Sequence, residues 1–221
     1  LVKAKIHPYY AIPGYLIKEN RKILQKYNKK ITVINHGYAI HTKYCKKTNK
    51  NLSSLSYLNL NQKEVVEDIL KGHDTIKSIC KKNPKIFRTP HFGEYCENSN
   101  MDFIYKILKN NKYTHSSSTT PIFSMINSPI FCKKNIYEMP SSAYLNNPLQ
   151  IIDSWSISNS NVSYKDLYIE LIKYYQLMKN YNIFLNIYFD PSDIINESLI
   201  FKAFFKLSKF QKRIENFKVL Q

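Results

Sequence analysis

The chain has 221 residues, which is enough for one large domain or two small ones with a substantial core. Its hydrophobic content of 43% is typical of a folded globular protein, and no apolar run approaches the ~20 residues of a membrane-spanning helix. The formal charge of +17 favours an acidic partner such as nucleic acid, an anionic glycan or a lipid surface. Because the lysines are scattered and no nucleic-acid motif is present, we expect no specific nucleic-acid binding.

Cysteine usage and the N-terminus say less about function. The four cysteines are too far apart to form a CxxC pair, which argues against a zinc knuckle and leaves two disulfides or free thiols open. No secretory signal is visible in the first residues, and no transmembrane segment is expected. The location, in the cytoplasm or the cell envelope, and the oligomeric state stay open.

Short apolar runs alternate with helical patterns in the first half of the chain. The expected elements are a strand at 2–6, an amphipathic helix at 15–27, a strand at 31–35, a polar loop to about residue 60 and a helix at 62–81. Asn61 followed by Glu64 has the spacing of a capping box, which marks the start of the last of these helices.

The same alternation continues to the C-terminus. The expected elements are strands at 85–88, 112–118, 135–139, 150–155 and 182–189, helices at 101–110 and 164–180, and a helical tail from residue 192. Residues 118–148 carry four prolines and are expected to be mostly irregular. Strand and helix in alternation predict a parallel α/β fold, open or closed into a barrel, within a single domain at residues 1–221.

Two of the six histidines, His36 and His41, lie five residues apart around Gly37. On a regular helix or strand this spacing would turn the two rings away from each other. They converge on one ion only if the chain leaves regular structure between them, which Gly37 makes easy. The alternative is that one is a surface residue and the other a hydrogen-bonded core residue.

Polar residues also follow three other expected strands. These residues are Arg88, Thr89, Pro90 and His91 after the strand at 85–88, Asp153, Ser154 and Trp155 after the apolar residues Ile151 and Ile152, and Asp190 after the strand at 182–189. Each has an ordinary reading as a surface ion pair, a cap, a core side chain or a turn residue. Their shared place at the carboxyl ends of strands resembles the active site of a barrel enzyme.

The order of these motifs resembles the polysaccharide deacetylase family, whose shared domain is named for the nodulation chitooligosaccharide deacetylase. The resemblance covers about residues 1–207. Its most specific stretch is PKIFRTPHFGEY at 84–95, between two expected helices, and HGYAIH and IYFDP are similar to the family's second and last motifs. The resemblance implies a distorted and incomplete (β/α) barrel.

The resemblance also implies a function and a set of roles. The activity would be metal-dependent hydrolysis of an N-acetyl or O-acetyl group on a polysaccharide or oligosaccharide, with zinc or a similar divalent ion. The implied metal ligands are His36 and His41, with a third ligand expected upstream. The implied catalytic and substrate-binding residues are Arg88, Pro90, the His91 backbone, Asp153, Trp155 and Asp190.

The chain departs from the family pattern in four places. The two histidines are five apart instead of four, and His91 replaces the usual aromatic residue after the motif proline. No Asp-Asp pair, which supplies one metal ligand and the general base in the family, occurs in the sequence. Asp190 stands where the family has a histidine general acid, and an ionised aspartate is a poor proton donor.

Two explanations account for these departures. The sequence is either a fragment that begins after the first motif, which the start in an apolar strand favours, or a diverged relative that has lost its metal. The first hypothesis is therefore a deacetylase domain that is inactive as given. The second is a non-catalytic glycan-binding relative with a basic surface.

Overall fold

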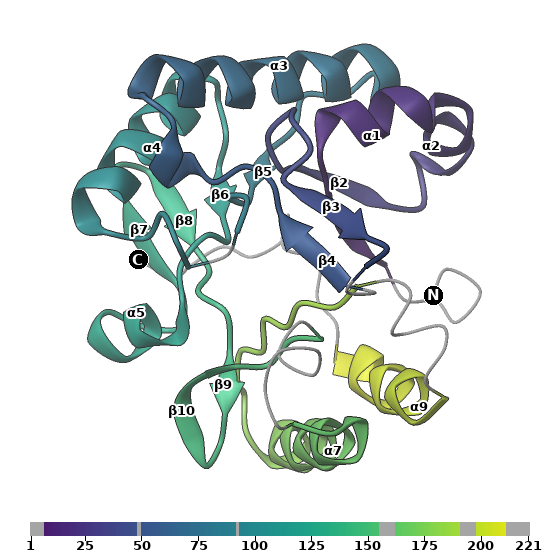
Figure 1. The fold of residues 1–221 in the computed structure, drawn as a ribbon. Coiled ribbons are helices and arrows are strands. Elements are labelled where there is room, and N and C mark those ends of the chain that lie inside the picture. The colour runs from purple at the N-terminus through teal and green to yellow at the C-terminus, as the bar shows by residue number, and fades with distance from the viewer. Residues whose placement is uncertain (1–6, 48–49, 92, 155–161, 191–197, 211–221) are drawn as a thin grey trace. The chain divides into compact units, whose positions relative to one another are not determined.

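The computed structural model describes residues 7–47, 50–91, 93–154, 162–190 and 198–210 (Figure 1). The chain separates into two compact units, residues 9–140, and residues 141–221 together with 1–8. The single domain expected from the sequence stays a prediction. Within the described ranges no helix is both long and apolar enough to cross a lipid bilayer.

The unit of residues 9–140 is built on a six-stranded sheet with the order β1-β2-β5-β6-β8-β7. The first five of these strands are parallel, and only β7 runs antiparallel at the edge. The strands are β1 (Tyr9–Ile12), β2 (Thr32–Asn35), β5 (Ile86–Phe87), β6 (His115–Ser116), β7 (Phe131–Lys133) and β8 (Ile136–Glu138). The predicted parallel α/β fold is confirmed, and four of the strands expected from the sequence form its centre.

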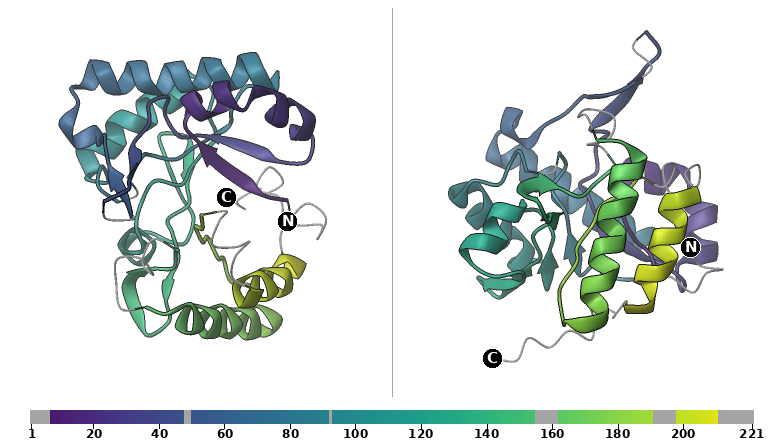
Figure 2. Two further views of the ribbon diagram at one scale, coloured as in Figure 1. Left: turned by 45° about the vertical axis from the view of Figure 1, so that its right-hand side comes forward. Right: turned by 90° about the horizontal axis from the view of Figure 1, so that it is seen from below.

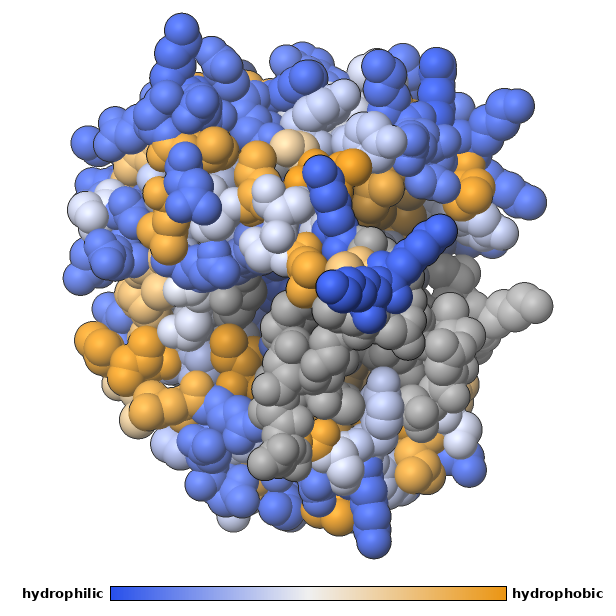
Figure 3. All heavy atoms as spheres, in the orientation of Figure 1, coloured by the Kyte–Doolittle hydropathy of each residue, from blue (hydrophilic) through white to orange (hydrophobic). Residues whose placement is uncertain are grey.

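Helices cover this sheet, and Figure 2 shows α3 alongside α1 in further views. The helices of the unit are α1 (Gly14–Glu19), α2 (Arg21–Tyr27), α3 (Gln62–Cys80), α4 (Asn98–Asn110) and α5 (Pro121–Ile126). The capping box at Asn61 and Glu64 forms as predicted, with both reciprocal hydrogen bonds. The helix expected at 15–27 is interrupted at Asn20, whose side-chain amide donates to the Leu16 carbonyl. Hydrophilic side chains cover most of the outer face over α3 (Figure 3).

The polar loop expected up to residue 60 is a wrong prediction. It contains an antiparallel hairpin of β3 (Thr42–Cys45) and β4 (Lys50–Ser53), and a short 3₁₀ helix, η2 (Tyr57–Asn59). The residues of the two strands, TKYC and KNLS, contain no apolar run that would predict a strand.

Two glycines, Gly14 on α1 and Gly72 on α3, allow the backbone after β2 to pack directly against these helices. A Cβ on Gly72 would lie 2.4 Å from the Asn35 Oδ1 atom and 2.7 Å from the Gly37 carbonyl oxygen. A Cβ on Gly14 would lie 2.7 Å from the Tyr38 ring. The loop that starts at His36 is therefore pressed against two helices at a distance that only glycine permits.

The second unit contains a hairpin of β9 (Ala143–Tyr144) and β10 (Asn147–Ile151), two long helices, α7 (Tyr164–Asn180) and α9 (Ser198–Leu207), and η3 (Ser208–Phe210). The predicted helix at 164–180 is confirmed, including its Ser163 capping box, and α9 confirms a helical tail. The strand expected at 182–189 is wrong, since these residues form only one bridge, between Tyr188 and Asp153. Their apolar side chains pack instead against the core formed by α7 and α9. The strand expected at 2–6 lies outside the described residues.

Candidate active site

The carboxyl ends of the five parallel strands meet along one edge of the sheet in the unit of residues 9–140. The residues that directly follow these strands are Pro13, His36, Arg88, Ser117 and Met139. Ligand sites in parallel α/β folds form at this edge. Two of the sequence-predicted site residues, His36 and Arg88, therefore lie on neighbouring strands as expected.

His36 is buried and held by a main-chain contact. Its Nδ1–H donates to the Arg88 carbonyl oxygen at 2.8 Å. This contact fixes the tautomer and leaves Nε2 as the atom that carries a lone pair. Burial, followed by the charge repulsion of nearby His41, holds the pKa of His36 well below its usual value, so its imidazole is neutral at pH 7.

The side chains of His41 and His36 lie close together despite the five-residue spacing. The two ring centroids lie 4.5 Å apart with the rings nearly perpendicular. Gly37 makes this possible because it adopts a φ of 71°, in the left-handed region where the chain reverses easily. The His41 Nδ1 atom is buried. Burial lowers the pKa of His41 to about 4.

His91 closes the other side of this group. Its Nε2–H donates to the His41 carbonyl oxygen at 2.8 Å and lies 3.0 Å from the Ser53 Oγ atom. Its ring centroid is 5.4 Å from that of His41. His91 adopts a φ of 48°, which is rare for a residue with a side chain and often marks a functional constraint. The family resemblance implies that the His91 backbone helps to bind the oxyanion of the reaction, and this role stays a prediction.

Asp68, which sequence reasoning did not single out, holds the loop between the two histidines. Its Oδ1 accepts the Ala39 N–H at 2.8 Å, and its Oδ2 accepts the Tyr57 hydroxyl at 2.8 Å. A signal was present in the sequence, because Asp68 lies next to Ile69 and three residues after Val65 on the buried face of α3. An acidic side chain at such a position usually has a specific partner.

Arg88 is buried and fixed by the neighbouring strand end. Its Nε–H donates to the Ser117 carbonyl oxygen at 3.0 Å, and Nη2 donates to the Ser117 hydroxyl at 2.9 Å. Pro90 is also buried in this loop. The main chain beside Arg88 is fixed as well, since the Thr89 N–H donates to the Ser118 hydroxyl at 3.1 Å.

A fully buried carboxylate, Glu138, holds the neighbouring loop that follows β6. Its Oε1 accepts the N–H groups of Ser118 and Thr119 at 2.7 and 3.0 Å and the Thr119 hydroxyl at 3.0 Å. Its Oε2 accepts the Tyr105 hydroxyl at 3.1 Å. Sequence reasoning missed Glu138, because only the sheet order places β8 beside β6.

The remaining predicted site residues belong to the other unit. Asp153 is buried, and Asp190 is half-buried, with its N–H donating to the Ser154 hydroxyl at 2.8 Å and its Oδ1 accepting the Tyr188 hydroxyl at 3.0 Å. Trp155 lies outside the described residues. The family resemblance also implies an ion pair between Arg88 and Asp153, which stays a prediction because the two residues belong to different units.

The residues that follow β1, the strand next to β2, have no side chain that could serve as a metal ligand. This strand, which the sequence did not suggest, is followed by Pro13 and Gly14, and the Gly14 N–H donates to the Gly37 carbonyl oxygen at 2.9 Å. His36 and His41 present two neutral imidazoles, which suit zinc. Among the described residues, no three His, Cys, Asp or Glu side chains gather closely enough to bind a metal ion. Metal binding by His36 and His41 therefore stays a prediction, which would need further ligands beyond these two imidazoles.

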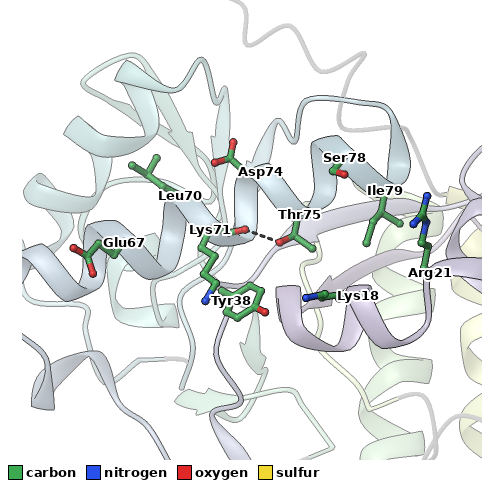
Figure 4. A pocket seen from close by; sticks show the side chains of 10 residues that line it. All are labelled: Lys18, Arg21, Tyr38, Glu67, Leu70, Lys71, Asp74, Thr75, Ser78 and Ile79. Carbon is green, nitrogen blue, oxygen red and sulfur yellow. Dashed lines mark hydrogen bonds between the residues drawn. The ribbon is translucent and has the colours of Figure 1, made fainter.

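A groove of about 620 Å³ lies between α1, α2 and α3, beside the loop that carries the histidines. Figure 4 shows the side chains that line it, which are Lys18, Arg21, Tyr38, Glu67, Leu70, Lys71, Asp74, Thr75, Ser78 and Ile79. Three of these are cations and two are carboxylates. The Lys71 Nζ atom lies 4.0 Å from the centre of the Tyr38 ring, which is a favourable cation–π distance.

Comparison with known proteins finds similarity in structure. No family model matches the sequence, and no curated protein matches it either. A protein from Mycobacterium smegmatis assigned as a polysaccharide deacetylase matches 94% of this chain and 66% of its own, at 11% identity and a TM-score of 0.64. A carbohydrate esterase family 4 pseudoenzyme from Bacillus anthracis matches 96% of this chain and 54% of its own, at 13% identity and a TM-score of 0.53.

The chain has the fold of a polysaccharide deacetylase. The resemblance seen in the sequence is confirmed at the level of this fold, and the chain spans 66% and 54% of the lengths of the two structures. An allantoinase matches 93% of this chain and 61% of its own, at 8% identity and a TM-score of 0.62. The deacetylase fold is thus also that of an enzyme with another substrate, so the fold by itself does not select the reaction.

The low pKa of His41 predicts a loss of stability in acid. Below pH 6.5 the unfolded chain binds a proton on His41 that the folded chain does not bind until about pH 4, so this contribution is complete above pH 6.5 and is lost as the pH falls. Between pH 7.5 and pH 4.5 the free energy of unfolding should therefore fall by about 2–3 kcal/mol less in His41→Asn than in the wild-type chain. Urea unfolding of both proteins at both pH values, with a chelator present, measures it. An equal loss in both proteins contradicts the prediction.

Proposed function

We propose that the protein is a polysaccharide deacetylase-like hydrolase that binds a divalent metal ion, preferably zinc, through His36 and His41. Its substrate is an N-acetyl or O-acetyl group on a polysaccharide or oligosaccharide. The observation that supports the proposal is the approach of these two neutral imidazoles at the end of β2, beside the buried Arg88. Further donors must come from outside the described residues.

Each of these residues would have a separate role in the hydrolysis. A divalent ion at His36 and His41 would supply Lewis-acid polarisation of the amide or ester carbonyl and a more acidic water. Arg88, fixed by Ser117, presents a permanent positive charge at the same edge of the sheet, suited to orienting a carboxylate such as Asp153. The N–H groups of the loop at Pro90 and His91 are suited to an oxyanion.

Two other residues have proposed roles that follow from the family resemblance. Trp155 would form the wall of the acetyl pocket. Asp190 would replace the histidine that protonates the leaving group, which requires a raised pKa in the substrate complex. Both roles are part of the proposal.

Metal binding tests the proposal without any assay of activity. We expect the chain to bind one zinc ion after dialysis, by elemental analysis and titration calorimetry, and His36→Ala and His41→Ala to lose it. His115→Gln is the matched control, because His115 lies on β6 and contacts Thr114 and Tyr137 instead of the site. Equal zinc binding by all four proteins contradicts the proposal.

A second candidate is a non-catalytic protein that binds an anionic glycan. The end of β1 favours it, because Pro13 and Gly14 there offer no carboxylate, and the groove beside Tyr38 carries three cations. This candidate predicts salt-sensitive binding of hyaluronan, weakened several-fold in Arg21→Ala and Lys71→Ala and unchanged in Lys106→Ala on α4. Zinc binding without hyaluronan binding would support the hydrolase instead.

A further inference from the structure

We infer that Asp68 is the positioning residue that sets the shape of the 36–41 loop and thereby brings the two imidazoles together. The inference rests on the proposed function for its consequence, which is metal affinity. Its structural part concerns the loop alone and is measured separately.

Asp68 makes its contact in the middle of the loop, between the two histidines. The Asp68 Oδ1 atom accepts the Ala39 N–H at 2.8 Å, and this hydrogen bond links the loop to the side of α3 in addition to the packing of Gly37 on Gly72. A hydrogen bond to an ionised carboxylate is about twice as strong as one between neutral groups. The contact therefore adds a side-chain anchor at Ala39, in the part of the loop that follows the two main-chain hydrogen bonds from α1 to Gly37 and Tyr38.

The second carboxylate oxygen is held from the other side. Tyr57, which is 1% exposed, donates its hydroxyl to the Asp68 Oδ2 atom at 2.8 Å. Burial and then the nearby Asp68 hold the pKa of Tyr57 well above its usual value, so the hydroxyl keeps its proton and remains a donor. Asp68 is thus oriented by one neighbour and uses its other oxygen on the loop.

The close packing of Gly37 shows that the carboxylate and the turn fit each other directly. A Cβ on Gly37 would lie 2.1 Å from the Asp68 Oδ2 atom and 2.9 Å from the Tyr57 hydroxyl oxygen. Only glycine leaves room for the carboxylate at this point, and only glycine adopts the φ of 71° without strain. The turn at Gly37 and the Asp68 carboxylate therefore depend on each other for their positions.

Asp68 itself stands on a rigid support. It lies in α3, whose neighbouring residues Val65 and Ile69 are fully buried in the core and whose first turn is closed by a capping box. A side chain on such an element is placed more accurately than one on a loop. Through Asp68, the rigid helix α3 therefore determines where the histidine loop lies, although the two bonded residues are 29 positions apart in the sequence.

The test uses Asp68→Ala, which removes both acceptors, and Asp68→Asn, which keeps the shape and one acceptor. We expect the Ala39 amide hydrogen to exchange at least ~10-fold faster in Asp68→Ala than in the wild-type chain, as expected for the loss of one charge-assisted hydrogen bond. Asp68→Asn is expected to restore most of the protection. Tyr57→Phe, which leaves the Ala39 contact in place, is expected to change it by a smaller factor.

Zinc affinity is the second readout, measured on the same four proteins. We expect a 10–100-fold loss in Asp68→Ala and partial rescue in Asp68→Asn, as is typical when a residue that orients metal ligands is removed. If the wild-type chain binds no zinc, the proposed function fails, while the exchange measurement still decides the role of Asp68.

The inference is overturned by an Ala39 amide that exchanges equally fast in the wild-type chain and in a folded Asp68→Ala. If Asp68→Ala does not fold, the inference is tested by the exchange rate of the Ala39 amide in the wild-type chain and in Asp68→Asn. Protection in the wild-type chain that falls by only a small factor in Asp68→Asn supports the inference, because this variant loses the charge and keeps one acceptor. A wild-type amide that exchanges at the rate of an open loop refutes it.

Discussion

The 221-residue chain is expected to release no measurable acetate from acetylated chitooligosaccharides or peptidoglycan, whichever divalent metal is added. Hydrolysis of an amide needs a base that takes a proton from the attacking water, and the sequence contains no Asp-Asp pair to provide it. The resemblance also implies that Asp190 stands where the family has the histidine that protonates the leaving amine. Each lost proton-transfer group typically costs ~10²–10⁴-fold, so both together leave ~10⁻⁴–10⁻⁸ of the ordinary rate.

An enzymatic acetate assay with an active polysaccharide deacetylase as positive control measures this. The matched control within the chain is Arg88→Ala, which is expected to give the same background as the wild-type chain. Metal-dependent acetate release that disappears in His36→Ala or Arg88→Ala would show that a catalytic base has been overlooked in this chain.

Removal of the buried carboxylate of Glu138 is expected to have the largest effect on stability. Glu138→Ala leaves the N–H groups of Ser118 and Thr119 and two hydroxyl groups without their acceptor in a site with no solvent access. Each unsatisfied buried donor costs about 1–3 kcal/mol, part of which is recovered by rotation of the hydroxyls and entry of water. We expect a loss of about 3–5 kcal/mol in the free energy of unfolding.

Urea unfolding followed by circular dichroism measures this loss. Glu138→Gln is the control for charge, because its amide oxygen still accepts from the two main-chain N–H groups, and it should cost about 1–2 kcal/mol. Tyr105→Phe removes a single donor and should cost about 1 kcal/mol. A Glu138→Ala protein as stable as the wild-type chain would mean that the network of Glu138 has no energetic role.

The sequence by itself determined the elements whose signals are local. The helices at α3 and α7 were predicted with their capping residues, because a capping box and an apolar stripe involve residues only three or four positions apart. The strands β2 and β5 were predicted from short apolar runs, and both are followed by the polar residues that the sequence singled out. These signals were sufficient to predict the parallel α/β fold and to place His36 and Arg88 at its edge.

Only the tertiary structure determined which segments pair with each other as β-strands. The apolar run at 182–189 has strong strand propensity, yet its side chains reach the core of α7 and α9 without a neighbouring strand along its length. The polar hairpin of β3 and β4 shows the reverse, because its backbone pairing needs no apolar pattern. Pairing depends on the position of a second segment, which a local pattern does not contain.

The geometry of the site was decided in the same way. Whether His36 and His41 converge depends on the turn at Gly37 and on Asp68, which lies 29 residues beyond the loop amide that it binds. Glu138 reaches the loop after β6 only because β8 is the next strand in the sheet. Residue types and their order fixed which groups were available for chemistry, and the packing of strands and helices fixed which of them lie within hydrogen-bonding distance of one another.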